Sequence, residues 1–560
     1  MLQLPALELW NGDKSGLKDS LSFAGVFVPT DLVWRAQLQA DSSIEEVPFK
    51  TDLEHLGTAA FHNHILTAFV TTVEQRLAIA SDSAIGRFAL RIAPATEREL
   101  AQALSASFSL VDPVSTLSAV RSQLRRRLED LGLFRRRLNR VGVFDPPGPI
   151  EDLIDLDFMA VLGSAAAAVD ELADGAVHRW GLCFDELELC PLEIRQRLLH
   201  LLRSTDSQFV FKFAISPYDD DISSFNVIGA AQAGHDFEIV NLTHGRRSAI
   251  DSFSRQLVDK VLASRELSGG PAKVFGRSIM SDLPRKTLPS APYSPNSPQV
   301  KTMRQLAVDD ASFAAYLLDK DLDLDTLGEL PKPTLHRYVR KVIHYVAIRD
   351  AYRPRDTGGA PRHQGLLPYT GVPLVYALCD GNPRLLIGVI NSMLAHIESG
   401  KVPEDAQAAI IREAVERLRS LLRTIGARGT DVMSDGPEMS LMDFLDRIGR
   451  YFRSTLLDEP FRADPPGSFL VDDAAAVRYT PLLGLALNAG AIIHVASGGG
   501  RVLRDVADLV DQRFRLSYLL GAHYRLPLRL DRAVNLTAVM ARPTAVLPHT
   551  ATQQLPGLEG

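Results

Sequence analysis

Two adjacent carboxylates follow a short apolar stretch in the first half of the chain. Residues 180–190 read WGLCFDELELC, so that three apolar residues lead directly into Asp185 and Glu186. A buried strand would place these acids at the carboxyl end of a sheet, where open α/β sheets bind ligands. There the first acid can hold Mg²⁺ and the second can deprotonate an attacking water. The alternative is a strand that simply meets solvent at an acidic turn.

Two further segments carry residues suited to a phosphate site. The apolar segment FVFKFAISP begins at Phe209 and ends in Ser216 and Pro217. Residues 379–394 read CDGNPRLLIGVINSML, which predicts a turn followed by an amphipathic helix with Arg384 in its first turn. Arginine suits phosphate because its charge is permanent and its fork matches phosphate oxygens. The alternatives are a turn-forming serine and a solvated arginine.

The order of these motifs resembles AAA+ P-loop ATPases. It is similar to the origin-recognition initiator clade and to the related STAND-type signalling ATPases. More specifically, it resembles bacterial origin-recognition-like AAA ATPases, several of which occur near anti-phage or mobile-element genes. Phrases like FKFxxSPYD and RFRLSYLL…YRLPLR occur in those proteins. Here they span Phe211 to Asp219 and Arg513 to Arg529.

The resemblance implies a nucleotide site and assigns its residues. Asp185 would be the Walker B acid that holds Mg²⁺, and Glu186 would activate water. Ser216 would be sensor 1, which detects the γ-phosphate of ATP, and Arg384 would be sensor 2. The protein would be an ATP-dependent switch that assembles as a homo-oligomer or with a companion effector, in a bacterial defence or mobile-element system. The alternative is a degenerate, non-hydrolysing ATPase fold that serves as a DNA- or protein-binding scaffold.

The sequence departs from this family at the phosphate loop. No G-x-x-x-x-G-K-[ST] motif occurs, and the nearest segment, Gly12 to Ser15, has Asp at position 13 and no preceding strand. We therefore expect the chain to begin just downstream of that loop, and to hydrolyse ATP only if the loop is encoded upstream. The arginine finger is also unassigned, with four candidates: Arg195, Arg203, Arg246 and Arg247.

Apolar strands that alternate with amphipathic helices predict an α/β fold. We expect an N-terminally truncated parallel-sheet P-loop NTPase core, then a helical lid and a small α+β winged-helix-like module. The predicted domains are a core over 1–265 with a helical insert near 95–175, a Pro/Gly/Ser-rich linker over 266–300, a lid over 301–430, the winged-helix-like module over 431–545 and a loose tail over 546–560.

Local patterns predict the individual elements. Strands are expected at 22–29, 180–185, 208–215, 237–242, 469–473, 491–497 and 513–520. Helices are expected at 54–80, 95–106, 113–140, 150–173, 191–204 and 246–264. The apolar stretch from Tyr479 to Gly500 is broken by Pro481 and several glycines, so it predicts a buried helix followed by a strand rather than a membrane span.

Composition limits the class of protein and its expected cellular location. Its 560 residues are 46% hydrophobic and 23% charged with a net charge of -7, which suits a globular protein of several domains. Three cysteines form neither a disulfide framework nor a metal-ligand pair, and no signal peptide is evident, so a cytoplasmic location is expected.

Two arginine-rich segments are candidates for DNA contact. Residues 121–140 hold eight arginines, and residues 501–542 hold eight arginines against four aspartates. Clustered arginines can contact backbone phosphates. A solvated helix or a protein-partner surface is the alternative for the first segment, and a protein-interaction module for the second.

Overall fold

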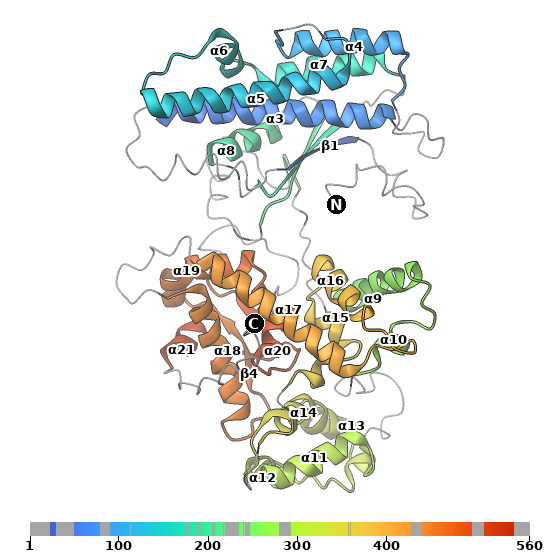
Figure 1. The fold of residues 1–560 in the computed structure, drawn as a ribbon. Coiled ribbons are helices and arrows are strands. Elements are labelled where there is room, and N and C mark those ends of the chain that lie inside the picture. The colour runs from blue at the N-terminus through green and yellow to red at the C-terminus, as the bar shows by residue number, and fades with distance from the viewer. Residues whose placement is uncertain are drawn as a thin grey trace, which may run out of the picture. The chain divides into compact units, whose positions relative to one another are not determined.

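The chain divides into two compact units, Met1–Ile239 and Val240–Gly560, here called the first and second units. Figure 1 draws their helices and strands, and each unit is described by itself. The computed structural model describes residues 23–29, 50–78, 90–111, 114–174, 179–187, 190, 192–203, 208–216, 218, 235–238, 240, 247–278, 293–356, 358, 360–363, 365–426, 439–495 and 509–542.

The first unit contains a three-stranded parallel sheet in the order β1-β2-β3. Its strands are β1 (Ala24–Pro29), β2 (Trp180–Asp185) and β3 (Phe209–Phe213). The sequence predicted all three, and the bounds of β2 agree residue for residue. The middle strand β2 is buried from Trp180 to Phe184, whereas β3 is mostly half-exposed. The burial of β2 explains its uninterrupted apolar sequence, which is typical of a parallel strand covered on both faces.

Helices cover this sheet in successive layers (Figure 1). The long α3 lies against it, with Phe69 tilted against Trp180 at 4.7 Å and Phe61 stacked near Phe184 at 6.2 Å. Helix α5 packs on α3, and α4 packs on both α5 and α7. The helices of this unit are α3 (Lys50–Ala78), α4 (Pro94–Ser107), α5 (Leu117–Val141), α6 (Gly148–Ile154), α7 (Phe158–Leu172) and α8 (Leu192–His200), followed by a 3₁₀ turn (Leu201–Arg203).

The helix predicted over 150–173 is two helices. Helix α6 ends at Ile154, and α7 begins at Phe158 with Asp157 as its N-cap, whose carboxylate accepts from the Ala160 N–H at 3.2 Å. An aspartate before a helix satisfies an otherwise unpaired N–H, so it favours a new start over a continued helix. Of the strand predicted over 237–242, residues 237, 238 and 240 are described and belong to no named strand, and the other three lie outside the described residues.

The second unit begins with α9 and α10, which were predicted to belong to the core domain and to the linker. Helix α9 falls within the predicted core domain, yet it packs against α15 and α16 of the second unit. The predicted exposed linker over 266–300 contains α10, whose Val274 and Phe275 are 1% exposed. The helices in this part are α9 (Arg247–Ser264), α10 (Pro271–Phe275), α11 (Pro298–Asp309), α12 (Ala311–Asp319), α13 (Lys332–Thr334), α14 (Ile343–Tyr352), α15 (Leu374–Leu378), α16 (Pro383–Leu394) and α17 (Glu404–Gly426), with 3₁₀ turns at Leu327–Glu329 and Leu367–Tyr369 and a π-helical turn at Leu335–Arg340.

A buried glutamine fastens α10 to this part of the unit. Gln407 is fully buried; its amide nitrogen donates to the carbonyls of Phe275 and Val402 at 3.0 and 2.9 Å, and its amide oxygen accepts from the Gly371 N–H at 3.0 Å. One side chain thus satisfies backbone groups from three segments. Buried polar groups that are fully hydrogen-bonded specify one arrangement of their neighbours.

The remaining elements, α18 to α21, are here called the C-terminal module. A four-stranded sheet has the order β5-β6-β4-β7, with β6 antiparallel to both neighbours and β7 parallel to β4. The elements are α18 (Leu441–Leu457), β4 (Pro466–Leu470), α19 (Asp473–Asn488), β5 (Ile492–His494), β6 (Arg513–Leu516), α20 (Tyr518–His523), β7 (Arg532–Asn535) and α21 (Leu536–Ala541).

The module confirms the buried helix and strand predicted from Tyr479 onward, as α19 and β5. The strand predicted over 513–520 ends at Leu516, because Ser517 caps α20 and turns the chain into a helix. Strand β7 was not predicted. Within the described part of the chain, no helix combines the length and apolar character that a bilayer crossing requires.

Candidate functional site

The acid pair lies at the carboxyl end of β2, the middle of the three described strands. Asp185 is the last residue of β2 and pairs in register with Pro29, the last residue of β1. On the other side, the Ala214 N–H donates to the Phe184 carbonyl at 2.9 Å and the Leu187 N–H donates to the Ala214 carbonyl at 3.1 Å. These bonds fix the chain on both sides of the two carboxylates, so the place where they leave the sheet is well defined.

Glu186 adopts a backbone conformation that is unusual for its residue type. Its φ is +56°, in the left-handed region that residues other than glycine seldom occupy. Its N–H donates to the Asp185 carboxylate at 3.2 Å. The turn leaves Asp185 half-buried and Glu186 exposed. The two acids therefore differ in environment: one is held at the sheet edge and the other projects beyond it.

Ser216 lies on the segment that leaves the carboxyl end of β3. It is half-buried and follows Ala214, the residue that is hydrogen-bonded to the end of β2. Tyr218 close behind it is 3% exposed. Since β2 and β3 are parallel neighbours, Asp185, Glu186 and Ser216 all belong to the same edge of one sheet.

A histidine at this edge was not identified from the sequence. The Nε2–H of His64 on α3 donates to the carbonyl of Pro29 at 3.0 Å, and Pro29 is the register partner of Asp185. Its neighbour in sequence, His62, instead stacks on Phe158 with ring centroids 4.6 Å apart, and burial and the nearby Arg197 lower the pKa of His62 to about 4. No local signal separates the two histidines, because only the packing of α3 shows which one reaches the strand end.

The turn before α16 has the geometry predicted for residues 379–394. Helix α16 begins at Pro383, and the Asn382 side chain caps it by accepting from the Leu385 N–H at 3.1 Å. Gly381 has a φ of +77°, which glycine adopts without strain. Arg384 is exposed in the first helical turn. The side chain is therefore presented to solvent at a helix N-terminus, where backbone N–H groups also favour anions.

The structure brings together three of the four predicted site residues. Asp185, Glu186 and Ser216 lie in the first unit, whereas Arg384 lies in the second, and each unit is described by itself. Of the arginine-finger candidates, Arg195 is 9% exposed on α8. The side chains of Arg203, Arg246 and Arg247 lie outside the described residues.

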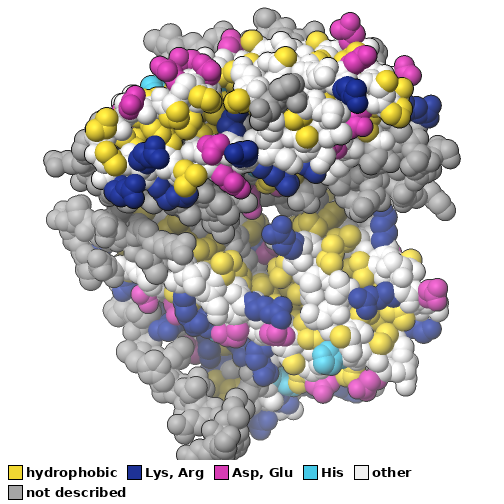
Figure 2. Space-filling view, turned by 45° about the horizontal axis from the view of Figure 1, so that its top comes forward, with side chains coloured by type: hydrophobic (Ala, Val, Ile, Leu, Met, Phe, Trp, Pro, Cys, Tyr) yellow, Lys and Arg dark blue, Asp and Glu magenta, His cyan; other side chains and the backbone are white. Residues whose placement is uncertain are grey.

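The arginines of residues 121–140 lie on α5, and most of them are exposed. Arg121 pairs with Glu74 at 2.5 Å, and Arg127 donates to two carbonyl oxygens just after α4 at 2.8 and 2.9 Å. Figure 2 shows Lys and Arg side chains beside exposed hydrophobic ones on the helical face of this unit. The exposed members are Arg125, Arg126, Arg136, Arg137 and Arg140.

The arginines of residues 501–542 are mostly engaged within the second unit. Six of the eight lie among the described residues, and two of these, Arg532 and Arg542, are exposed. Five of the six contact carboxylates, carbonyls or aromatic rings: Arg513, Arg515, Arg525, Arg529 and Arg542. This segment therefore offers less free positive charge than its composition suggests.

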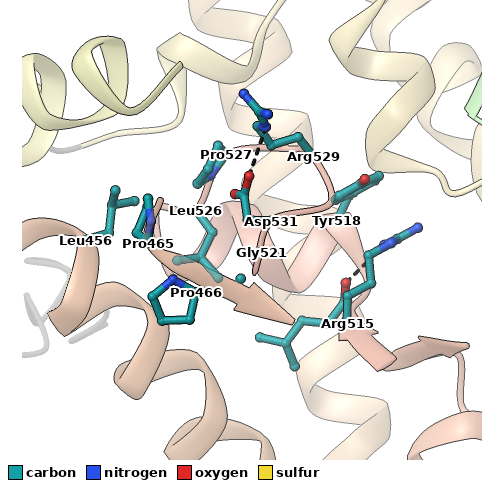
Figure 3. A pocket seen from close by; sticks show the side chains of 12 residues that line it. Leu456, Pro465, Pro466, Arg515, Tyr518, Gly521, Leu526, Pro527, Arg529 and Asp531 are labelled. Carbon is teal, nitrogen blue, oxygen red and sulfur yellow. Dashed lines mark hydrogen bonds and ion pairs between the residues drawn. The ribbon is translucent and has the colours of Figure 1, made fainter. Parts of the chain in front are cut away.

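A small cavity in the C-terminal module is lined in part by the ion pair of Arg529 and Asp531 (Figure 3). Asp531 accepts a hydrogen bond from the Tyr345 hydroxyl at 2.6 Å and forms an ion pair with Arg529, whose Nε lies 2.9 Å away. Burial raises the pKa of Asp531 to about 6, against the opposing effect of these partners. Because each charged group on the wall already has an ionic partner, the cavity has the character of a packing site.

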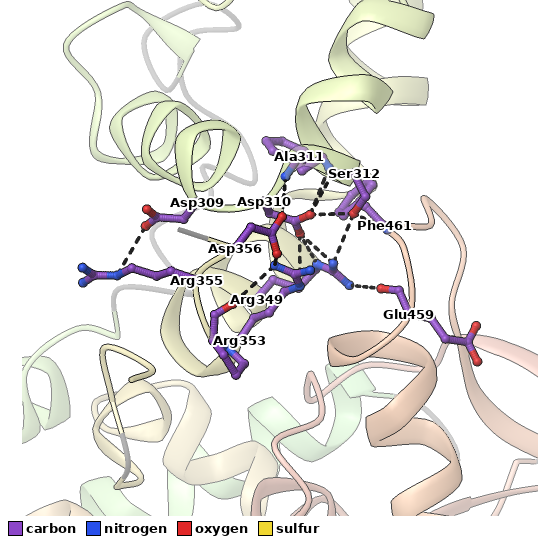
Figure 4. A network of polar contacts seen from close by, with 12 residues as sticks. Asp309, Asp310, Ala311, Ser312, Arg349, Arg353, Arg355, Asp356, Glu459 and Phe461 are labelled. Atoms are coloured by element: carbon purple, nitrogen blue, oxygen red, sulfur yellow. Dashed lines mark hydrogen bonds and ion pairs between the residues drawn. The ribbon is translucent and has the colours of Figure 1, made fainter. Parts of the chain in front are cut away.

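A second buried network joins the α11–α12 junction to the C-terminal module (Figure 4). Arg349 and Asp310, both at most 1% exposed, form an ion pair at 2.6 Å. Arg349 also donates to the carbonyls of Leu456 and Glu459, and the Phe461 N–H donates to the Ser312 hydroxyl at 2.8 Å. The network satisfies a buried charge and fastens α14 to the end of α18.

The first unit is thus an α/β domain with an acid pair at the carboxyl end of the middle strand of its described parallel sheet. A sequence model of the ORC-CDC6-like family matches residues 1–536, and the chain belongs to this family. The match confirms the resemblance to origin-recognition-like AAA+ ATPases. No curated protein and no solved structure matches the chain.

Proposed function

We propose that the protein is a nucleotide-dependent switch whose site is built on the carboxyl end of β2. The observation that carries this proposal is the placement of Asp185 and Glu186 at that end, with Glu186 in a left-handed conformation. Residues held in sparsely populated backbone conformations cluster at active sites and ligand-binding turns. The membership in an initiator-type AAA+ family supports the same conclusion, because AAA+ proteins generally bind ATP with Mg²⁺.

The donor set fits one Mg²⁺ shared with a nucleotide. No cluster of three or more His, Cys, Asp or Glu side chains occurs among the described residues. Mg²⁺ suits such a site, since it is commonly bound by one or two carboxylates together with phosphates and water. Asp185 would hold the ion, and the exposed Glu186 would take a proton from water. Bound Mg²⁺ would neutralise charge on the phosphate oxygens.

Ser216 and Arg384 would complete the site as sensors of the γ-phosphate. Ser216 shares the sheet edge with the acids, and its hydroxyl can donate to a phosphate oxygen. Arg384 is exposed at the start of α16, as a phosphate ligand must be.

The C-terminal module supports a winged-helix-like assignment. The order α18, β4, α19, β5, β6 with β6 paired between β4 and β5 matches a helix-strand-helix-hairpin plan. It departs from that plan by its single helix between the first two strands and by the added β7. In this proposal the module binds a partner, and assembly occurs with further copies of the chain or with an effector protein.

One observation favours a second candidate function. The sequence holds no G-x-x-x-x-G-K-[ST] motif, the loop that holds nucleotide phosphates in P-loop ATPases. In this candidate the same fold is a scaffold that binds DNA or protein without hydrolysis. The exposed arginines of α5 would then be the anion-binding surface.

The test is nucleotide binding and turnover by the protein translated from its complete reading frame. We expect Glu186→Gln to keep mant-ATP affinity while phosphate release falls about 100-fold, since a positioned general base contributes that much or more. Asp185→Asn should remove the Mg²⁺ dependence of binding. Arg384→Ala should weaken ATP more than ADP, because the lost contact is to the γ-phosphate.

The matched control is Arg417→Ala on α17, an exposed arginine in a surface pair with Glu413. It should leave binding unchanged, because exposed pairs contribute little. Turnover that survives Glu186→Gln would refute the assignment of that residue. A protein with no ATP binding at all would favour the scaffold.

A further inference from the structure

The turn that presents Arg384 is held by a part of the chain far away in sequence. Asp380 lies four residues before Arg384 and has a φ of +49°. Its two carboxylate oxygens accept from the Arg515 guanidinium and from the Tyr518 N–H, each at 2.7 Å. Arg515 is on β6 and Tyr518 starts α20, so both donors belong to the C-terminal module.

The ion pair is almost closed to solvent. The side chains of Arg515 and Asp380 are 9% and 10% exposed. The Arg515 guanidinium lies 3.7 Å from the centroid of the Tyr518 ring and also donates to the Leu516 carbonyl at 3.0 Å. A charge-assisted hydrogen bond in such a setting is strong and directional, and breaking it leaves a buried charge without its partner.

A short hydrogen-bonded path connects this pair to the start of α16. The Asn382 N–H donates to the Cys379 carbonyl at 2.8 Å, which closes the turn on either side of Asp380. The Leu386 N–H then donates to the Asn382 carbonyl at 3.0 Å, and the Asn382 side chain caps the helix. The direction in which Arg384 leaves the helix therefore depends on where Asp380 is fixed.

We infer that Asp380 and Arg515 are a positioning pair through which the C-terminal module sets the orientation of Arg384. The inference rests on the proposed nucleotide function and extends it. Nucleotide engagement by Arg384 and the state of the C-terminal module are coupled through this pair. A displacement of the β6–α20 junction moves the turn, and a phosphate that holds Arg384 restrains the junction in return, as linkage between sites requires.

The same strand offers a matched control. Arg513 lies two residues before Arg515 and donates its Nε–H to the Ser468 hydroxyl at 2.9 Å and a further N–H to the Asp531 carbonyl. All of these partners lie inside the C-terminal module. Arg513→Met therefore removes an arginine from the same strand without touching the turn before α16.

The first measurement is backbone hydrogen exchange in the full chain. We expect Arg515→Met to speed exchange at Leu385 and Leu386 by about tenfold or more relative to α18, since a hydrogen bond to a charged group is lost. Asp380→Asn keeps the size of the side chain, and it gives the same readout if Arg515→Met does not fold. Arg513→Met should leave exchange at the two leucines unchanged. Unchanged exchange in both Arg515→Met and Asp380→Asn would overturn the positioning role.

The second measurement is mant-ATP affinity of the same variants. We expect affinity to fall about tenfold in Arg515→Met and Asp380→Asn, to recover in part in Arg515→Lys, and to stay unchanged in Arg513→Met. A loosened turn with full affinity would overturn the coupling. If the unaltered chain binds no mant-ATP, the proposed function fails, whereas the exchange data still decide whether Arg515 holds the turn.

Discussion

Two segments of this chain contain the same number of arginines and use them differently. Residues 121–140 and 501–542 hold eight each. On α5 five are exposed, whereas in the second segment five of the six described arginines contact groups of the second unit. Composition counts charges but does not report their partners. The comparison therefore identifies α5 as the stronger candidate for an anion-binding surface, and residues 513–542 as a region where arginine stabilises the fold.

The largest effect on folding is expected from an engaged arginine. Arg529→Met should lower the free energy of unfolding of the second unit by about 2 kcal/mol at neutral pH, because it leaves the Asp531 carboxylate buried without its cation. Urea unfolding followed by circular dichroism measures this change. Arg532→Ser, in the same segment but exposed, should stay within about 0.5 kcal/mol. Equal effects of the two variants would contradict the contrast between engaged and exposed arginines.

A second effect on stability is expected from pH. The pKa of Asp531 is raised to about 6 by burial, so the folded state holds this proton more tightly than the unfolded chain does. Its contribution to stability is fully present below the pKa of the unfolded carboxyl, near 4, and is lost as pH rises through about 6. A rise of about two pKa units corresponds to at most about 3 kcal/mol between these limits. Asp531→Asn should flatten that part of the stability profile, and an unchanged profile would contradict the raised pKa.

The smallest effect on folding is expected on α5. Changing Arg136, Arg137 and Arg140 to serine should alter stability by less than about 0.5 kcal/mol for each residue, because all three are exposed. If the helix contacts phosphates, the salt dependence of binding to a short DNA duplex should fall by a slope of about 3. Fluorescence anisotropy over a salt series measures it. An unchanged slope would assign α5 to a protein partner or to solvent.

Local patterns predicted the parts of the candidate site that local forces determine. The strand 180–185, the strand that leads to Ser216 and the turn before Arg384 follow from apolar runs and capping residues. The break between α6 and α7 was missed even though Asp157 is a good cap, since the apolar pattern on either side of it suits one helix. The strand predicted through residue 520 instead ends at Leu516. Here too a capping residue, Ser517, starts a helix within a continuous apolar pattern.

Long-range pairing could not be predicted. His64 reaches Pro29 across 35 positions, and Arg515 reaches Asp380 across 135. The hydrophobic periodicity of a single segment does not predict such a long-range partner, because the contact depends on how distant elements pack. The same limit applies to α9 and α10. Their sequences show that they are helical or Pro/Gly-rich, whereas their packing depends on contacts with α15, α16 and α17.

The amide of Gln407 has a consequence for how the chain can be divided. It bonds the Phe275 carbonyl, and the Val402 N–H donates to the neighbouring Val274 carbonyl at 2.8 Å. A fragment that starts at residue 301 would lose both of these hydrogen bonds. It would also expose the side chains that Val274 and Phe275 cover in the full chain. A fragment that begins at residue 247 keeps both hydrogen bonds and should therefore be more stable to urea than one that begins at residue 301.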